Sequence, residues 1–515
     1  QGSRLKEALP HCEAGPSASS ENSDVGSHTP RGKMSNSNMP LEERTVGVLD
    51  RDDAKMQKGY TLFNAGRETY LIDEDGRVVH EWRSSRNVFC GYLLPNGHLL
   101  RDGSENLEAP CFQAGGAAGF VEEVTWDNEV VWSHAMTPYS TFLTHHDLQV
   151  LPNGNVLVLC WQRKSKDEAM AAGRRPDLLP DGEVWDDLVV ELAPDGKGGA
   201  AVVWKWSMWD HLVQDYDPNR SNFGDVAAHP ELFDINFCPP GGKAGARNRD
   251  GKTAGPNPSG LEVAKVEGKT GEKDWLHINA MSYDAVRDQI VLSVNSVSEF
   301  IIVDHGTTTD EASVHSGGKL GKGGDILYRF GNPQVARQGS HKEQVLFCQH
   351  SVKFLRGVPG DGNILLFNNG RAPDRQWSSV DEYRLPDHNG EYERSYSTAG
   401  RKDRVWTFGP HIGRRGSFYC THISACQRLP NGNTLVTMGP QGILVEVTPD
   451  GEEVWRYVSP VMILEGAVGY ARQGDTRTSG RFSLFFGHRY APNHPAFNGD
   501  GDQPRILTPG RYLEV

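Results

Sequence analysis

The 515-residue chain lacks the features of several common protein classes. Its eight cysteines are far apart and form no CxxC pair, so neither a disulfide framework nor a zinc cage is expected. The formal net charge of −14 argues against nucleic-acid binding, because phosphate recognition needs a basic surface. No apolar run approaches the roughly 18 residues that a membrane span requires. No Walker loop, HExxH motif or serine nucleophile elbow is present.

The N-terminal region has too few apolar residues to build a hydrophobic core. Residues 1–45 are rich in Ser, Gly, Asn and charged side chains, so we expect a disordered tail. This region also contains no apolar signal core, which makes the cytoplasm the default compartment. Residues 46–515 follow a different pattern, and we expect them to form a single domain. The sequence carries no signal for an oligomeric state.

A pattern of short strands repeats along residues 46–515. Each unit contains a strand, a D-G or D-N turn, a strand ending in tryptophan, a strand leading into Pro-Asn-Gly, and a fourth strand. Four antiparallel strands with recurring turns form a propeller blade, and about six units are present. The sequence therefore predicts an all-β fold, a six-bladed β-propeller, in preference to paired β-sandwiches or two smaller barrels. The tryptophan marks are Trp82, Trp132, Trp204, Trp406 and Trp455.

Two long insertions interrupt the repeat. The larger runs from about residue 208 to 273 and is rich in Gly, Pro and Lys. A segment of this length is expected to be a lid, a binding loop or a disordered loop. The second insertion, from Gly306 to Lys322, is also rich in glycine.

Histidines recur at one position of the repeat. His146, His277, His350 and His422 lie near the start of an inner or middle strand in four consecutive units, and His145 precedes the first. Because radial repetition brings equivalent positions to one end of a central channel, we expect these histidines to converge. One of His145 and His146 should point away, since side chains alternate along a strand. A single histidine beside a strand is usually structural, but four at related positions predict a functional site.

Such a cluster supports two kinds of chemistry. One neutral imidazole can act as a nucleophile while the others serve as acid, base and anion donors. Alternatively, the imidazoles can ligate a transition metal. The motifs contain few carboxylates, which disfavours the metal, because ligating histidines usually donate their second N–H to a carboxylate or carbonyl. The polar residues nearby are Asp147, Asn279, Asn295, Asn368, Asn369 and Arg371. A non-catalytic binding scaffold is a third interpretation.

These motifs resemble the arylsulfotransferase family of PAPS-independent enzymes over most of residues 60–500. The similarity rests on Leu143–Asp147 before LPNGN, Asp274–Asn279 before DQIVLSVNSVSEFIIVDH, Gln349-His350 before GNILLFNNG, and His422–Ser424 before QRLPNGNTL. The segment Gly487–Pro492, which contains His488, is similar to the family's closing segment.

The resemblance implies a six-bladed propeller that transfers a sulfuryl group from a phenolic sulfate to a phenol or other hydroxyl through a sulfated histidine. Neither a cofactor nor a metal is expected, and the partners are a small aryl sulfate and a phenol. By motif order, His350 corresponds to the nucleophile, and His146, His277 and His422 to the histidines around the sulfuryl group.

The chain departs from the family pattern at one position. The family has an arginine just after the strand that follows the His277 motif, where this chain has Asn295. The expected substrate-binding residues are Asn295, His145, Asn279, Arg371 and His488. The competing metal enzyme would place iron or copper among the same four histidines.

Overall fold

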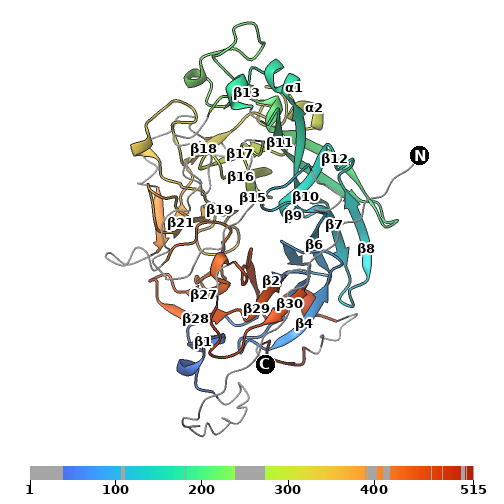
Figure 1. Cartoon of the computed structure of the whole chain (residues 1–515), viewed down its shortest axis with the longest axis vertical. Helices are drawn as coiled ribbons and strands as arrows, with labels where there is room; N and C mark the ends of the chain where they lie inside the picture. The colour runs from blue at the N-terminus through green and yellow to red at the C-terminus, as the bar shows by residue number, and fades with distance from the viewer. Residues whose placement is uncertain are drawn as a thin grey trace, which may run out of the picture.

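The computed structural model describes residues 39–105, 111–179, 181–237, 273–388, 391–392, 403–409, 418–464, 467–477, 480–499, 505 and 507–513. Six antiparallel sheets follow one another around a ring (Figure 1), which confirms the predicted six-bladed β-propeller. The helices in the described residues are short, and α1 (Lys166–Ala171) and α2 (Thr309–Ala312) are the α-helices among them. None of these helices has the length and hydrophobicity needed to cross a membrane.

The blades are given from the innermost strand outward. Blade 1 contains β31 (Gly487–Tyr490), β2 (Tyr60–Ala65), β3 (Glu68–Ile72) and β4 (Val78–Arg83). Blade 2 contains β5 (Gly91–Leu93), β6 (Leu99–Ser104), β7 (Gly119–Val124) and β8 (Val130–Ala135). Blade 3 contains β9 (Phe142–Val150), β10 (Val156–Ser165), β11 (Glu183–Pro194) and β12 (Ala200–Ser207).

The second half of the ring has the same order. Blade 4 contains β15 (Ile278–Asp284), β16 (Gln289–Val294), β17 (Glu299–Asp304) and β18 (Tyr328–Phe330). Blade 5 contains β19 (His350–Phe354), β20 (Ile364–Asn368), β21 (Ser379–Tyr383) and β24 (Arg404–Phe408). Blade 6 contains β25 (Ala425–Arg428), β26 (Thr434–Met438), β27 (Ile443–Val447), β28 (Glu453–Val458) and, outermost, β1 (Gly47–Arg51). The hairpins β22 (Asp387–His388) with β23 (Glu391–Tyr392), and β29 (Val461–Leu464) with β30 (Ala467–Tyr470), lie outside the blades.

The tight turns that mark the repeat in sequence are formed as predicted. Gly76 and Gly451 take positive φ angles of 81° and 85° in the hairpins that precede the fourth strands, β4 and β28. Gly97 and Gly154, from the Pro-Asn-Gly signals, have φ angles of 85° and 87°. Residues with a Cβ rarely adopt this backbone region, whereas glycine enters it freely. The glycines therefore allow the short connections that keep consecutive strands paired.

The predicted tryptophans lie on the fourth strand of each blade, counted from the innermost strand, and most of them join neighbouring blades. The indole N–H of Trp82 in blade 1 donates to the carbonyl of Thr125 in blade 2 at 3.1 Å. The indole of Trp455 in blade 6 donates to the carbonyl of Glu74 in blade 1 at 3.0 Å. Trp204 donates to the side-chain hydroxyl of Thr307, and Trp406 to the carbonyl of Pro449, in the following blades. The repeat thus encodes contacts between blades as well as strands within them.

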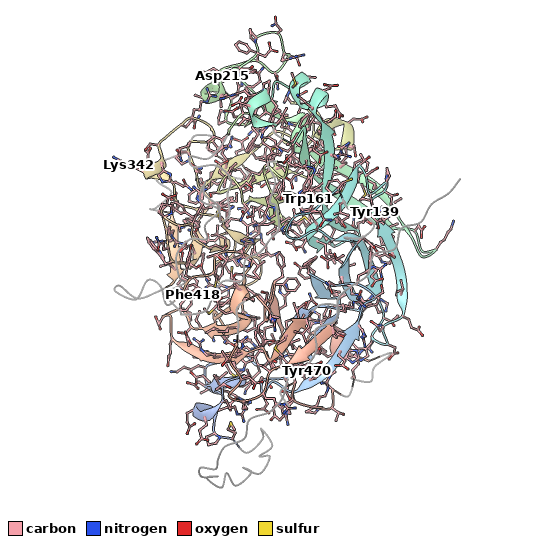
Figure 2. The ribbon with its side chains drawn as sticks, viewed as in Figure 1. Tyr139, Trp161, Asp215, Lys342, Phe418 and Tyr470 are labelled. Atoms are coloured by element: carbon pink, nitrogen blue, oxygen red, sulfur yellow. The ribbon has the colours of Figure 1, made fainter. Side chains whose placement is uncertain are left out.

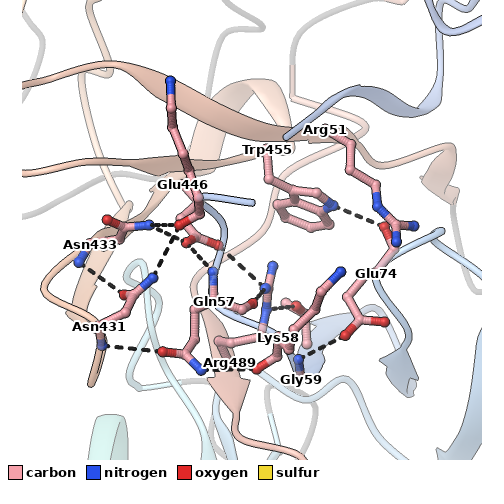
Figure 3. Close-up of polar contacts among 12 residues, drawn as sticks. Arg51, Gln57, Lys58, Gly59, Glu74, Asn431, Asn433, Glu446, Trp455 and Arg489 are labelled. Carbon is pink, nitrogen blue, oxygen red and sulfur yellow. Dashed lines mark hydrogen bonds and ion pairs between the residues drawn. The ribbon is translucent and has the colours of Figure 1, made fainter. Parts of the chain in front are cut away.

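The ring closes at a seam between blades 6 and 1. Strand β1 pairs with β28 on the outside of blade 6, whereas β31 forms the innermost strand of blade 1. The buried guanidinium of Arg489 on β31 lies 3.3 Å from the carboxylate of Glu446 on β27 (Figure 3). The backbone N–H of Gln57 donates to the other oxygen of this carboxylate at 2.6 Å, and Trp455 packs against the guanidinium. Backbone pairing and a buried ion pair therefore hold the two ends of the ring together.

The larger insertion is described as far as Phe237, where it packs on blade 4. Strands β13 (Leu212–Val213) and β14 (Phe233–Asp234) pair in parallel, and Arg329 of β18 donates to the carbonyls of Pro230 and Leu232. Residues 238–272 of the predicted lid or loop lie outside the described residues, as do residues 1–38 of the predicted tail. Residues 39–45 are described and include the 3-10 helix η2 (Leu41–Glu43).

Candidate functional site

The histidines that the sequence marks come from the innermost strands of neighbouring blades. His145 and His146 belong to β9, His277 directly precedes β15, His350 begins β19, and His422 lies shortly before β25. The rings of His146 and His277 meet edge to face, with centroids 4.4 Å apart. All five side chains are buried or largely buried. The structure therefore gathers residues that are up to 277 positions apart in the chain, between His145 and His422, around the axis of the ring.

A β-bulge accompanies the histidine in each of blades 3, 4 and 5. The pairing between the first two strands shifts register once in each of these blades. The inner pairs of blades 1, 2 and 6, all of which are described, stay in register. His146, His277 and Ser351 have positive φ angles of 55°, 52° and 55°. A bulge redirects a side chain, and left-handed residues other than glycine concentrate at functional sites.

The bulge in β9 changes the expected arrangement of the adjacent histidines. His145 and His146 do not separate onto opposite faces, because the Nδ1 atoms of the two rings lie 3.0 Å apart. The alternation expected from sequence is wrong here because His146 has a left-handed backbone. The imidazole of His145 stacks on the indole of Trp161 at a centroid distance of 4.1 Å. Figure 2 shows Trp161 in the interior of the propeller.

Hydrogen bonding fixes the tautomer of His350. The amide nitrogen of Asn369 donates to the carbonyls of Cys420 and Ile423 at 2.8 and 2.9 Å. The amide oxygen of Asn369 therefore faces Nδ1 of His350, 2.8 Å away. Because an amide oxygen only accepts, Nδ1 carries the proton and Nε2 keeps a lone pair. Burial lowers the pKa of His350 to about 3, so this ring is neutral near pH 7.

His277 has the opposite electrostatic environment. Its Nδ1 lies 2.5 Å from a carboxylate oxygen of Asp274, whose side chain is 2% exposed. Burial alone would lower the pKa of His277, but Asp274 and Asp187 raise it above its ordinary value. His277 can therefore hold a proton that the other histidines of the cluster give up. Asp274 belongs to the motif that the sequence marked, although no role was predicted for it, and the expected shortage of carboxylates does not hold at this position.

The remaining imidazoles of the cluster are neutral. Burial lowers the pKa of His146 well below its usual range, that of His145 to about 3 and that of His422 to about 4. Gly116 allows His146 to fit, because a Cβ at Gly116 would lie 2.2 Å from Nε2 of the ring. Nδ1 of His422 lies 2.9 Å from the hydroxyl of Thr421.

The predicted substrate-binding asparagines contact the backbone next to His350. Asn279 and Asn295 each donate to the carbonyl of Gln349 at 3.0 Å. Asn295 thus helps to position the segment that leads into His350. Arg371 follows the same strand as Asn369, and its guanidinium lies 3.7 Å from Asp374.

His488 belongs to an adjoining group of inner-strand residues. Its ring lies 4.9 Å from that of Tyr92, and burial lowers its pKa to about 3, with a smaller effect from Lys353. The Tyr92 hydroxyl donates to Asp147 at 2.7 Å, and the ammonium of Lys353 lies 3.2 Å from the same carboxylate. Sequence reasoning missed Tyr92 and Lys353. The feature of the sequence that could have identified them is a polar residue within a segment predicted to form the innermost strand of a blade, here blades 2 and 5.

The four predicted catalytic histidines are not arranged as a metal-binding set. Within the described part of the chain, three possible ligand atoms lie within 4.8 Å of one another only at His211, His315 and Asp325. That group does not include any residue of the histidine cluster.

Fold and site together define a six-bladed β-propeller with a cluster of buried histidines of unequal charge state. The family model for arylsulfotransferase (ASST) matches residues 45–459, and the chain belongs to this family. This confirms the resemblance seen in the motifs. No curated protein matches the chain.

Several solved structures are distantly similar. A protein of unknown function from Bacteroides caccae has a TM-score of 0.37 and 12% identity, over 78% of this chain and 94% of that one. The β-propeller domain of Cps50 (Swd1) from Myceliophteria thermophila has a TM-score of 0.36 and 9% identity, over 82% and 91%. A functionally unknown protein from Desulfotomaculum acetoxidans has a TM-score of 0.37 and 9% identity, over 80% and 99%. These similarities are too distant to bear on function.

Proposed function

We propose that this protein transfers a sulfuryl group from an aryl sulfate to a phenol or another hydroxyl acceptor through a covalent intermediate on His350. Membership of the arylsulfotransferase family supports sulfuryl transfer from aryl sulfates in general. The observation on which the finer proposal rests is the contrast between two histidines of one cluster. His350 is neutral with a free lone pair on Nε2, whereas Asp274 favours the protonated form of His277. Environments that push two pKa values apart assign an acid and a nucleophile or base.

In the first half-reaction, Nε2 of His350 attacks sulfur and the bond between sulfur and the aryl oxygen breaks. The departing aryl oxide takes the proton from the imidazolium of His277, which becomes neutral. The new N–S bond places positive charge on the ring of His350. Nδ1–H still donates to Asn369 and to the carbonyl of Cys348, at 2.8 and 3.2 Å, and these acceptors stabilise that charge.

In the second half-reaction, the acceptor hydroxyl gives its proton to neutral His277 and its oxygen attacks sulfur. The N–S bond breaks, and its electron pair returns to Nε2 of His350. His277 regains the proton that it lost, so one complete cycle leaves both histidines in their starting states. Exchange of a proton by a positioned side chain typically accelerates a step by about 10²–10⁴-fold.

The sulfuryl oxygens need donors that are present before the reaction begins. His146 and His422 have low pKa values, so near pH 7 each is a neutral ring with one N–H. The imidazolium of His277 supplies the positive charge near the sulfuryl oxygens. Asn295 instead donates to the Gln349 carbonyl. Fixed donors of this kind stabilise developing charge more effectively than water does, because they need no reorganisation.

Initial rates measured while aryl sulfate and phenol are both varied test the proposal. We expect a ping-pong pattern, because the first phenol leaves before the acceptor reacts. A panel of donors and acceptors, with products identified by mass spectrometry, would define the substrate range. An intersecting pattern that requires both substrates to be bound together would contradict the covalent intermediate. Absence of transfer across the panel would contradict the activity itself.

A further inference from the structure

We propose a zinc-binding site formed by His211, His315 and Asp325, separate from the histidine cluster. His211 follows the outermost strand of blade 3, immediately after the 3-10 helix η4 (Met208–Asp210). His315 and Asp325 lie in the connection between β17 and β18 of blade 4, beyond α2. The site would therefore join an outer segment of one blade to the glycine-rich insertion of the next.

The three side chains already present their ligand atoms to one another. Nδ1 of His315 lies 2.7 Å, and Nδ1 of His211 3.0 Å, from one carboxylate oxygen of Asp325. Tetrahedral zinc holds nitrogen and oxygen ligands at about 2.0–2.2 Å, which places neighbouring ligand atoms about 3.3 Å apart. By this estimate, the two distances between histidine and carboxylate need to lengthen by only a few tenths of an ångström to admit the ion. Two imidazoles and a carboxylate are ligands that zinc accepts.

The contacts of His211 leave one ring nitrogen available as a metal ligand. Its Nε2 lies 2.9 Å from the carbonyl oxygen of Ala312, which can only accept a hydrogen bond. Nε2 therefore carries a proton, and Nδ1, which faces a carboxylate oxygen of Asp325, is the atom that can ligate a metal. Donation of the second N–H to a carbonyl is also the usual outer contact of a metal-bound histidine.

Packing fixes His211 before any metal arrives. Its side chain is 0% exposed and lies parallel to Trp206, with ring centroids 5.8 Å apart. A Cβ at Gly324 would lie 2.1 Å from the Ala312 oxygen and 2.6 Å from Nε2 of His211, so a larger residue would disturb this contact. The side chain of His315, in contrast, is 59% exposed. The site is thus rigid on its inner side and open on its outer side, where water can occupy the fourth position.

Zinc titration into the full-length, untagged protein after chelator treatment tests this proposal. We expect one zinc ion per chain by calorimetry, and a higher Tm in its presence, because a ligand that binds only the folded state stabilises it. His315→Ala and Asp325→Asn should each weaken zinc binding by about tenfold or more and reduce the Tm increase. Because His315 is exposed, its alanine variant should leave the packing intact, and the Asp325→Asn variant keeps the shape of the side chain.

Two control variants separate this site from other histidines. His229→Ala removes an exposed histidine that also lies beside a carboxylate, Glu231, at 3.1 Å, and should bind zinc normally. His350→Ala removes a member of the catalytic cluster and should also bind zinc normally. Failure of the wild type to bind zinc, or unchanged binding by both the His315 and Asp325 variants, would overturn the proposal. Loss of binding in the His350 variant would instead place the zinc in the catalytic cluster and would equally overturn it.

Discussion

Blades 3, 4 and 5 differ from blades 1, 2 and 6 in the pairing of their innermost strands. The first group has a bulge in each inner pair, and the second group has none. The proposed nucleophile, His350, and the proposed acid, His277, both belong to the bulged group. The pKa of His350 is lowered and that of His277 is raised. The regular blades hold the ring together, whereas the departures from regularity direct the reacting groups. The repeated blades therefore form the scaffold, and the β-bulges in three of them position the proposed catalytic residues.

The two regions also use buried charge differently. At the closing seam, Arg489 and Glu446 form an ion pair in which both side chains are at most 1% exposed. At the site, the side chain of His277 is 16% exposed while that of Asp274 is 2% exposed. The first pair has a fixed charge and supports the fold. The second can exchange a proton with a substrate, so it supports a reaction. Variants in each region should therefore have separable effects.

The largest expected effect comes from His350→Ala. Removing the nucleophile should reduce kcat/KM for aryl sulfate by about 10⁴-fold or more, because the covalent route is lost. Far-ultraviolet circular dichroism should still show the folded propeller. His134→Ala, on the outer strand β8, is the matched control and should keep normal activity. Turnover close to that of the wild type in the His350 variant would remove this residue from the mechanism.

Arg489→Met tests the seam. Breaking a buried ion pair leaves Glu446 without its partner, which should lower the free energy of unfolding by about 3–5 kcal/mol. Chemical denaturation measures this loss, and activity per folded molecule should stay unchanged. The double variant with Glu446→Leu should recover part of the stability, because it removes the unpaired charge. Loss of activity in fully folded Arg489→Met would show that seam and site are not separable.

Asp274→Asn sharpens the contrast between His277 and His350. Because the carboxylate of Asp274 raises the pKa of His277, the protonated acid is available up to that pKa and is lost as pH rises through it. The amide lowers this pKa, so the alkaline fall in kcat/KM should move to lower pH. At neutral pH the rate should fall by about 10²-fold. Glu231→Gln, which removes the carboxylate beside surface His229, should leave the pH profile unchanged. An unshifted profile for Asp274→Asn would contradict the role of His277.

Gly116→Ala should have the smallest effect. The residue has a φ of 76°, and its added Cβ would lie 2.2 Å from Nε2 of His146. We expect a loss of about 1–3 kcal/mol in the free energy of unfolding, with reduced activity because the ring must move. Gly154 has a φ of 87° but open space around its Cβ position, so Gly154→Ala carries the backbone cost alone. Equal activity in the two variants would show that the position of His146 is not critical.

The fold and the gathering of the histidines were predictable from the sequence because both follow from the repeat. Tryptophans such as Trp82 and glycines such as Gly76 mark each blade, and radial geometry places equivalent positions together. The predicted domain boundaries at residues 45 and 208–273 fall partly outside the described residues and remain predictions. The pairing of Asp274 with His277 was not predictable, because it depends on an irregular segment before β15.

Long-range contacts account for the rest of what the sequence did not show. Tyr92 and Lys353 meet at Asp147 from three different blades, and no pattern along the chain links them. The bulges were also invisible, because these inner strands are buried at most positions and show no regular alternation that a one-residue shift could interrupt. His145 and His146 show the consequence, since ordinary strand alternation predicted opposite faces for rings that are in contact.

Trapping of the modified enzyme tests the central claim most directly. The protein should be mixed with aryl sulfate in the absence of acceptor, quenched at alkaline pH within one turnover, and digested for peptide mass spectrometry. The account predicts one sulfuryl group on the peptide that contains His350, removed when phenol is added before the quench. A sulfuryl group on another residue, or an unmodified enzyme that nevertheless releases the first phenol, would contradict it.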